Sequence, residues 1–489
     1  MLNSEIEKVG FLGQENRKPK GKKIIIIISA LVILIVLIIV LIVLLTKGDK
    51  KDNADDSNNG NNGNGESETQ YAKFLVKGTF IDTITKDEFR IRKGYILVEN
   101  GLINDFFEEN PDKSLKLYDY TNKIIIPGLS DLHLHAPQYL NAGLGLDLEL
   151  MDWLDKYTFP EESKYKDVEY AKKAYQVFVD DLAKSVTTRA SIFATLHTNI
   201  TLLLLDLLEE KKLCAYVGKV GMDRNSPEFY IEKNGKEETL RFVQECIKRN
   251  YTYAKPIITP RFTVSCTDEY MKYMGELAKE YNLPAQSHLS ESLSEIEYVK
   301  ELRKDSGDKF YGESYAKNGL FGGDVKTIMA HCVYSTEEEV ELIKQNGVYI
   351  AHCPTSNSNL ASGISPAAKY LREGCNIGIG SDLSGGHTLD LFEVMRHVIQ
   401  ISKMNFKHVQ HDQKPLTLTE TFFMATNKGG SFFGKVGVFQ KDYEFDAIVL
   451  DESLMKNLRE YDETERLERF IYSKDTKLES KFIRGNKIF

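Results

Sequence analysis

The residues best suited to chemistry are two histidines two positions apart, His133 and His135, which follow the apolar run Ile124–Ile126. Side chains alternate along a strand, so both imidazoles project from the same face. Later apolar runs lead to His288 and to Asp382. Three neutral nitrogens and one carboxylate form a ligand set typical of Zn²⁺, with Fe²⁺ as the alternative. The spacing therefore predicts one metal ion per chain, which would activate a water molecule.

Glu291 lies three residues after His288 and is not needed as a metal ligand. A carboxylate beside an activated water can accept a proton and return it during a reaction. We therefore predict that Glu291 is a catalytic acid and base.

These residues must be positioned by a repeating arrangement of strands and helices. Eight short apolar runs alternate with stretches of helical period, and most of the runs end on a polar side chain, among them His197, Lys219, His331 and His352. The eight runs are 123–135, 186–197, 213–220, 254–262, 283–291, 325–332, 347–357 and 375–382. This pattern predicts an α/β fold, a (β/α)8 TIM-type barrel over residues 128–430, in which the carboxyl ends of all strands face one mouth. An open, doubly wound sheet is the competing fold, but the count of eight favours closure.

The segments that flank the barrel are rich in alternating apolar and polar residues. Residues 71–127 predict short antiparallel strands, and the tail 431–489 contains three more candidate strands, at 445–452, 468–473 and 480–489. We expect both ends of the globular part to form one small β-sandwich domain.

The N-terminus has a different character. Residues 24–45 form an apolar run long enough to span a bilayer, so we predict a single transmembrane helix in contact with membrane lipid. A polar tail, 1–23, precedes it and a disordered linker, 46–70, follows it. Lys and Arg are denser before the run, which predicts a cytoplasmic N-terminus and an exoplasmic catalytic domain. A catalytic domain that faces the cytosol is the alternative.

The composition excludes some classes of function. The chain of 489 residues has 63 basic and 72 acidic side chains, so there is no basic excess to bind nucleic acid. Its six cysteines are scattered without close pairing, and we expect buried thiols rather than disulfides.

Several motifs resemble the amidohydrolase superfamily and, more narrowly, the guanine deaminase family. They are HAPQY (135–139), VGKVGMD (217–223), TPRF (259–262), QSHLSES (286–292), MAHC (329–332), AHCPTSN (351–357) and GSDLSGG (380–386). The resemblance runs from about residue 71 to the C-terminus. The combination of HAPQY with TPRF is what narrows it to the guanine enzymes.

The resemblance implies a role for each matching residue. The metal ligands would be His133, His135, His288 and Asp382; the catalytic residues would be Glu291, Asp382 and His331; and the purine would contact His135, Gln138, Arg261, Phe262, His288 and Asp382. It also implies a homodimer. Some relatives bridge two metals with a lysine from the fourth strand, but Lys219 closes the third run, which favours a single ion.

The activity implied is hydrolytic deamination of guanine to xanthine and ammonia. Deamination or hydrolysis of another heterocycle, such as 8-oxoguanine, cytosine or a triazine, is the first alternative. A membrane-tethered scaffold without activity is the second, although such a protein would be free to lose the metal ligands that this chain keeps.

Overall fold

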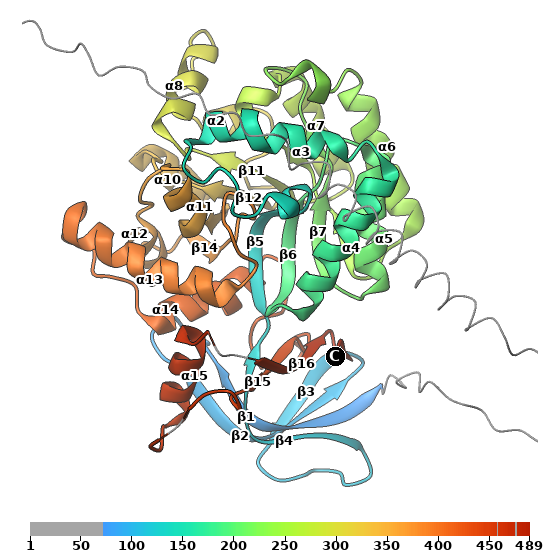
Figure 1. Cartoon of the computed structure of the whole chain (residues 1–489), viewed down its shortest axis with the longest axis vertical. Coiled ribbons are helices and arrows are strands. Elements are labelled where there is room, and N and C mark those ends of the chain that lie inside the picture. Colours follow the sequence, from blue (N-terminus) through green and yellow to red (C-terminus); the bar gives the residue numbers. More distant parts are fainter. Residues whose placement is uncertain (1–71, 457, 475–476) are drawn as a thin grey trace, which may run out of the picture. The chain divides into compact units, whose positions relative to one another are not determined.

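In the computed structural model of the chain, residues 72–456, 458–474 and 477–489 are described (Figure 1). The predicted tail 1–23, transmembrane helix 24–45 and linker 46–70 lie outside these residues. Within the described ranges, no helix has the length and apolar character needed to cross a membrane.

A closed parallel barrel forms the larger part of the described structure. In chain order its strands are β5 (Leu129–His135), β6 (Thr187–Phe193), β7 (Cys214–Gly218), β9 (Ala254–Pro256), β11 (Ala285–Leu289), β12 (Thr327–His331), β13 (Tyr349–His352) and β14 (Asn376–Ile379). The sheet order runs β11-β12-β13-β14-β5-β6-β7-β9, and a bridge between Ile258 and Ala285 joins its two edges. Each of the eight predicted runs holds one strand of the barrel, and the closure of the barrel excludes the open-sheet alternative. Two short strands, β8 (Val220–Gly221) and β10 (Thr259–Pro260), pair just beyond β7 and β9.

Helices surround the barrel, as Figure 1 shows. They are α4 (Val168–Lys184), α5 (Thr198–Glu210), α6 (Gly235–Arg249), α7 (Asp268–Glu280), α8 (Leu293–Leu302), α9 (Glu313–Ala316), α10 (Glu337–Gln345), α11 (Pro354–Asn359), α12 (Ala367–Arg372), α13 (Leu391–His408) and α14 (Leu418–Phe423), with short helical turns η3 (Glu228–Tyr230), η4 (Thr263–Ser265) and η5 (Met424–Lys428). Several begin at side-chain caps: Thr267 accepts a hydrogen bond from the Tyr270 amide at the start of α7. Such a cap satisfies an amide that the helix itself leaves unpaired.

A long excursion follows β5 before the first of these helices. It comprises η1 (Ala136–Asn141), α2 (Leu150–Trp153), η2 (Leu154–Thr158) and α3 (Phe159–Lys164). It carries residues that line the cavity at the mouth of the barrel, described below.

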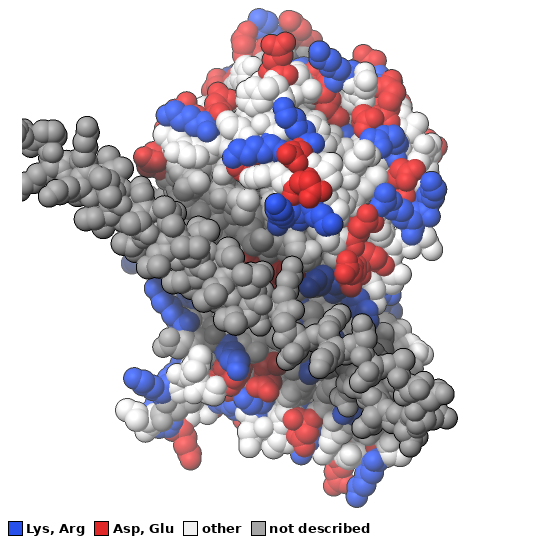
Figure 2. All heavy atoms as spheres, turned by 45° about the vertical axis from the view of Figure 1, so that its right-hand side comes forward, with Lys and Arg blue, Asp and Glu red and all other residues white. Residues whose placement is uncertain are grey.

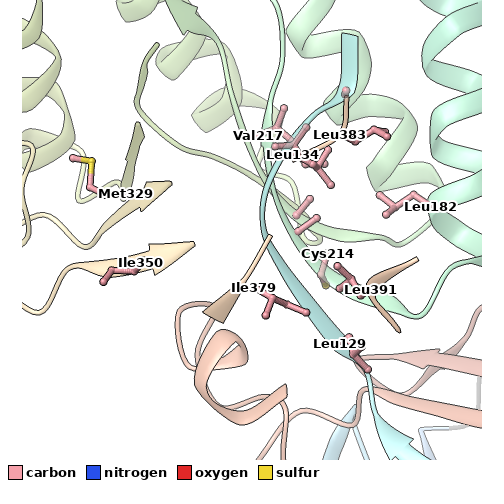
Figure 3. Close-up of a cluster of buried hydrophobic side chains, with 14 of the residues drawn as sticks. Leu129, Leu134, Leu182, Cys214, Val217, Met329, Ile350, Ile379, Leu383 and Leu391 are labelled. Atoms are coloured by element: carbon pink, nitrogen blue, oxygen red, sulfur yellow. The ribbon is translucent and has the colours of Figure 1, made fainter. Parts of the chain in front are cut away.

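The core is centred on β5, all seven residues of which are buried. Leu129 and Leu134 of β5 pack in a cluster with Val217 of β7 and Ile379 of β14 (Figure 3). Burying each such side chain contributes about 1.5–3 kcal/mol, which is why an apolar strand can hold polar residues rigidly at its end.

The two ends of the described chain join in a second sheet. It contains β1 (Lys73–Asp82), β2 (Arg90–Glu99), β3 (Leu102–Phe107), β4 (Lys116–Pro127), β15 (Ala447–Asp451), β16 (Lys477–Ile483) and β17 (Asn486–Lys487). The order is β17-β16-β15-β4-β1-β2-β3. The predicted β-sandwich is wrong, because this is one continuous sheet. The prediction of antiparallel strands throughout is also wrong, because β1 pairs with β4 in parallel.

Curvature gives this sheet its own core. Phe74 of β1 and Phe482 of β16 lie three strands apart, which is about 14 Å in a flat sheet. Their ring centroids are 6.3 Å apart. The sheet therefore curls until β1 and β16 share one aromatic cluster, which serves as the interior that a sandwich would have.

One predicted strand in the tail is a helix. Of residues 468–473, all but the last fall within α15 (Glu463–Tyr472), and Ser473 is its C-terminal cap. The helix begins with a capping box between Asp462 and Glu465. Its buried residues, Leu467, Phe470 and Ile471, recur at helical spacing. Read over six residues alone, the same apolar cluster resembles a strand.

The surface and the cysteines agree with the composition. On the face shown in Figure 2, acidic and basic side chains are interspersed. All six cysteines are buried and free, which confirms the prediction of unpaired thiols.

Candidate active site

Four polar side chains converge inside the mouth of the barrel. The Nε2 atom of His135 lies 3.2 Å from Nε2 of His133 and 3.2 Å from Nε2 of His288. Oδ1 of Asp382 lies 3.2 Å from the His133 nitrogen and 3.4 Å from the His135 nitrogen. The structure thus brings together all four predicted metal ligands.

These separations fit one ion. Four ligands arranged tetrahedrally at about 2.0–2.1 Å from Zn²⁺ lie about 3.3–3.4 Å from one another. Burial lowers the pKa of His133, His135 and His288, which keeps the imidazoles neutral, as ligation requires. In His288, Nδ1 lies 2.6 Å from the backbone oxygen of Arg261. That oxygen can only accept, so Nδ1 carries the proton and the lone pair of Nε2 faces the shared centre.

A buried carboxylate ties the first strand to the last. Oδ1 of Asp131 accepts hydrogen bonds from the backbone amides of His133, at 3.2 Å, and Ser381, at 2.9 Å. Asp131 therefore fixes the histidine pair of β5 against the loop that carries Asp382.

Glu291 stands beside this centre. Its Oε1 accepts a hydrogen bond of 2.9 Å from Ser362, and its Oε2 lies 3.4 Å from Nε2 of His331. Burial raises the pKa of Glu291 to about 7, despite the opposing effect of His331. A carboxyl group with that pKa can take up and release a proton near neutral pH.

His331 links the two acidic groups. Its Nε2 lies 3.7 Å from Oδ2 of Asp382, and its Nδ1 lies 2.9 Å from Oδ1 of Asn357. Burial disfavours the charged imidazole, but the carboxylates of Glu291 and Asp382 outweigh it and raise the pKa of His331. Burial likewise opposes ionisation of Asp382, but His133 and His331 hold its pKa well below the usual value.

The backbone is strained where these residues leave their strands. Ser290, His331, Cys332 and Asp382 all have φ between 46° and 77°. This left-handed region is costly for residues other than glycine, and such strain is concentrated at functional sites.

A cavity opens above the centre, with an empty volume of about 420 Å³ that includes space open to solvent. All the predicted catalytic and substrate residues line it: His135, Gln138, Arg261, Phe262, His288, Glu291, His331 and Asp382. Their individual roles remain predictions, but their convergence is a property of the fold.

Three other polar residues at strand ends lie apart from this cavity. Lys219 is buried in an ion pair with Glu232. His197 lies just before α5, and its pKa is lowered by burial and by Lys219. His352 is buried in the barrel, where burial lowers its pKa to about 3. None of them lines the cavity.

Some residues of the site were not predicted. Leu150, Trp153 and Leu154 come from the excursion after β5 and form an apolar wall, which Leu360 extends. Behind the wall, Glu162 contacts both Gln138 and Arg261. Asn357 falls within the quoted motif AHCPTSN, and Trp153 is the only tryptophan of the chain. No motif in the sequence around Glu162 predicts a place in the site, because the residues that it contacts come from distant segments.

Comparisons with known proteins agree with this geometry. The model of the amidohydrolase family matches residues 124–487. A guanine deaminase of Dictyostelium discoideum is 39% identical over 76% of this chain and 83% of its own length. The crystal structure of a guanine deaminase from C. acetobutylicum, with guanine bound in the active site, has a TM-score of 0.82 and 48% identity, covering 85% of this chain and 100% of that one.

A more distant structure shares the fold alone. The atrazine chlorohydrolase of Arthrobacter aurescens TC1, solved with zinc, has a TM-score of 0.75 and 15% identity, over 85% of this chain and 94% of its own. The family match and the closer relatives together show that the chain belongs to the amidohydrolase family and, within it, to the guanine deaminases.

Proposed function

We propose that the protein is a guanine deaminase, which hydrolyses guanine to xanthine and ammonia. The observation that carries this proposal is that one cavity is lined by Glu291, by three of the four proposed metal ligands and by the purine-binding candidates; these residues are His135, His288, Asp382, Gln138, Arg261 and Phe262. The guanine bound to the 48% identical relative supports the same substrate.

The metal is proposed to be zinc, one ion per chain, with Fe²⁺ as the alternative. His133, His135, His288 and Asp382 would hold it. When bound, such an ion lowers the pKa of a water molecule and so supplies a nucleophile at neutral pH.

The protein's own groups then carry the protons. Glu291 takes a proton from the attacking water and passes it to a ring nitrogen next to C2, as C2 becomes tetrahedral. The hydroxyl proton of this tetrahedral intermediate then moves through Asp382 or Glu291 to the exocyclic amine. The C2–N bond breaks, ammonia leaves, and the new carbonyl completes xanthine. His331, held between the two carboxylates, orients the water and stabilises the charge that develops on oxygen.

The aromatic and polar side chains that line the cavity would determine which base it binds. Phe262 and Trp153 supply flat apolar surface, while Arg261 supplies N–H donors and Gln138 an amide. The triazine-acting neighbour shares the barrel at 15% identity, so it supports the fold and not its own substrate.

The direct experiment incubates the purified full-length chain with guanine and follows xanthine and ammonia, with 8-oxoguanine, cytosine and a triazine in parallel. Stoichiometric xanthine from guanine, and little product from the others, is the expected result. Turnover of another base in preference to guanine would contradict the assignment.

We also propose that residues 24–45 anchor the enzyme in a membrane, with a cytoplasmic N-terminus and an exoplasmic catalytic domain. The charge distribution around the apolar run supports this orientation. The sequons at Asn199 and Asn250 both have exposed asparagines, so either could report it. We expect a mass shift on deglycosylation and protection from protease added on the cytosolic side of sealed vesicles. Digestion of the catalytic domain from that side would reverse the orientation.

The resemblance to the family further leads us to propose a homodimer. Light scattering of the purified protein should give twice the mass of the chain, and a monomer at micromolar concentration would refute it.

A further inference from the structure

Glu162 is a buried acid that the reaction does not use. It lies on α3 in the excursion after β5 and is buried. Its Oε1 accepts a hydrogen bond of 2.7 Å from Nε2 of Gln138, and its Oε2 accepts one of 2.8 Å from Nη1 of Arg261. One carboxylate thus holds both Gln138 and Arg261, the two polar residues proposed to contact the purine.

This contact fixes which way the Gln138 amide faces. An ionised carboxylate only accepts hydrogen bonds, so the amide must present its NH₂ group to Glu162. Its carbonyl oxygen Oε1 is then turned away, where it accepts the backbone N–H of Ser384 at 3.3 Å and keeps a second lone pair. Without the carboxylate, the amide could turn over and offer a donor instead.

The same contact balances the positive charge of Arg261 and fixes its position. Its guanidinium is almost fully buried, with its carbon 5.1 Å from the ring centroid of Phe159. A buried cation without a partner would favour anionic ligands. The carboxylate of Glu162, paired with it, makes this end of the cavity neutral overall and leaves the other N–H groups of Arg261 as donors.

We propose that Glu162 is a positioning residue that sets the substrate specificity of the enzyme. It fixes Gln138 as an acceptor and Arg261 as a donor, a pair that complements the neutral lactam edge of a purine, where a ring N–H lies beside a carbonyl. Guanine has that edge, and 2-aminopurine, which carries the same amine on C2, does not. This inference rests on the proposed guanine deamination.

The test compares Glu162→Gln with Glu161→Gln. Glu161 is the adjacent residue, also buried, but it pairs with Lys164, at 2.6 Å, and with Tyr170, away from the cavity. Both variants lose one buried negative charge from the same helix. The measurements are kcat and KM for guanine and for 2-aminopurine, metal content, and guanine binding followed by the fluorescence of Trp153.

We expect Glu162→Gln to raise the KM and the dissociation constant for guanine by about tenfold or more, because hydrogen bonds to a charged group are lost. The preference of kcat/KM for guanine over 2-aminopurine should fall by about the same factor. Metal content and kcat for guanine should change little. Glu161→Gln should retain the wild-type preference.

A second comparison isolates the route of action. In a Gln138→Ala background, Glu162→Gln should lose the part of its effect on the guanine preference that acts through Gln138, since that one of its two partners is gone. If Glu162→Gln does not fold, Glu162→Asp keeps the charge but is one methylene too short to reach both partners, and it should lower the preference as well.

Two results would overturn the inference. One is an equal loss of kcat/KM for guanine and 2-aminopurine in the Glu162 variants, and the other is the same loss of preference in Glu161→Gln. Failure of the wild-type chain to release ammonia from guanine is a different result, since it contradicts the proposed function itself.

Discussion

The two ends of the barrel bury ionisable side chains in opposite ways. Near the amino ends of the strands, Arg189 of β6 donates to Asp446 at 2.6 and 2.8 Å and to Glu444 at 2.5 Å. Arg189 and its two acidic partners are thus each paired with an opposite charge. At the mouth, the Nε2 atoms of His133, His135 and His288 face one another around a common centre, with no opposite charge for each ring.

The difference distinguishes buried polar groups that hold the fold together from buried polar groups that bind a ligand. The pairs around Arg189 are complete within the protein, so their purpose is to join the seven-stranded sheet to the barrel. The groups at the mouth are incomplete until a cation binds, and bringing them together costs free energy that ligand binding returns. Burial alone does not distinguish the two regions; the direction of donors and acceptors does.

Removing the metal should affect the mouth most strongly. A chelator should abolish guanine turnover and lower the free energy of unfolding by about 4 kcal/mol when the wild-type sample had been saturated at about a thousand times the dissociation constant. Metal content, turnover and thermal melting are the measurements. Restoring turnover with Zn²⁺ is the control. Full activity in metal-free protein would show that the groups at the mouth do not need a cation.

Replacing Glu291 with Gln should lower kcat by about 10³-fold, as the loss of a general acid and base does. Guanine binding, read from Trp153 fluorescence, and metal content should stay at wild-type levels. Activity close to that of wild type would remove Glu291 from the mechanism.

At the other end of the barrel, Arg189→Met should lower the free energy of unfolding by about 3–5 kcal/mol, because Asp446 is left as an unpaired buried charge. Chemical denaturation measures the loss, while kcat per folded molecule stays constant. Lys279→Met, which breaks an exposed pair with Asp324, is the control and should have no measurable effect. A large loss of kcat in folded Arg189→Met would mean that the ion pairs at the amino end of the barrel also support catalysis at the mouth.

The pH dependence should report Glu291. Its pKa is raised by burial to about 7, and the reaction needs the ionised form to accept a proton. The value of kcat/KM should therefore fall about tenfold for each pH unit below 7. A pH-rate profile that stays flat down to pH 5 would be inconsistent with this role.

The smallest effect should come from Ser362→Ala. Its hydroxyl stabilises the ionised form of Glu291 through a bond of 2.9 Å, so its loss should raise the pKa of Glu291 further. The acidic limb of the profile should move to higher pH by about one unit or less. Ser358→Ala, whose hydroxyl bonds within α11, should leave the limb in place.

Much of the barrel could be predicted from sequence because its signal is local. Each of the eight strands is a short apolar run that ends in a turn, and His133 and His135 follow from the period of one strand. The family motifs add Gln138, Arg261 and Phe262, which the structure places around one cavity.

What could not be predicted depends on contacts between distant segments. The role of Glu162 depends on its hydrogen bonds with Gln138, 24 residues away, and Arg261, 99 residues away. The curled sheet required the pairing of β4 with strands from both ends of the chain. Residues 468–473 were misread because a strand and one side of a short helix present similar apolar clusters over six positions.

The pairing of β4 with β15 has a consequence for synthesis. Ile125 and Ile126 of β4 are made early, but their neighbours Val449 and Ile448 emerge from the ribosome more than 300 residues later. Until then the nascent chain holds an apolar strand with one unprotected side, the kind of edge that recruits other chains. A message truncated before codon 447 would leave that edge open permanently.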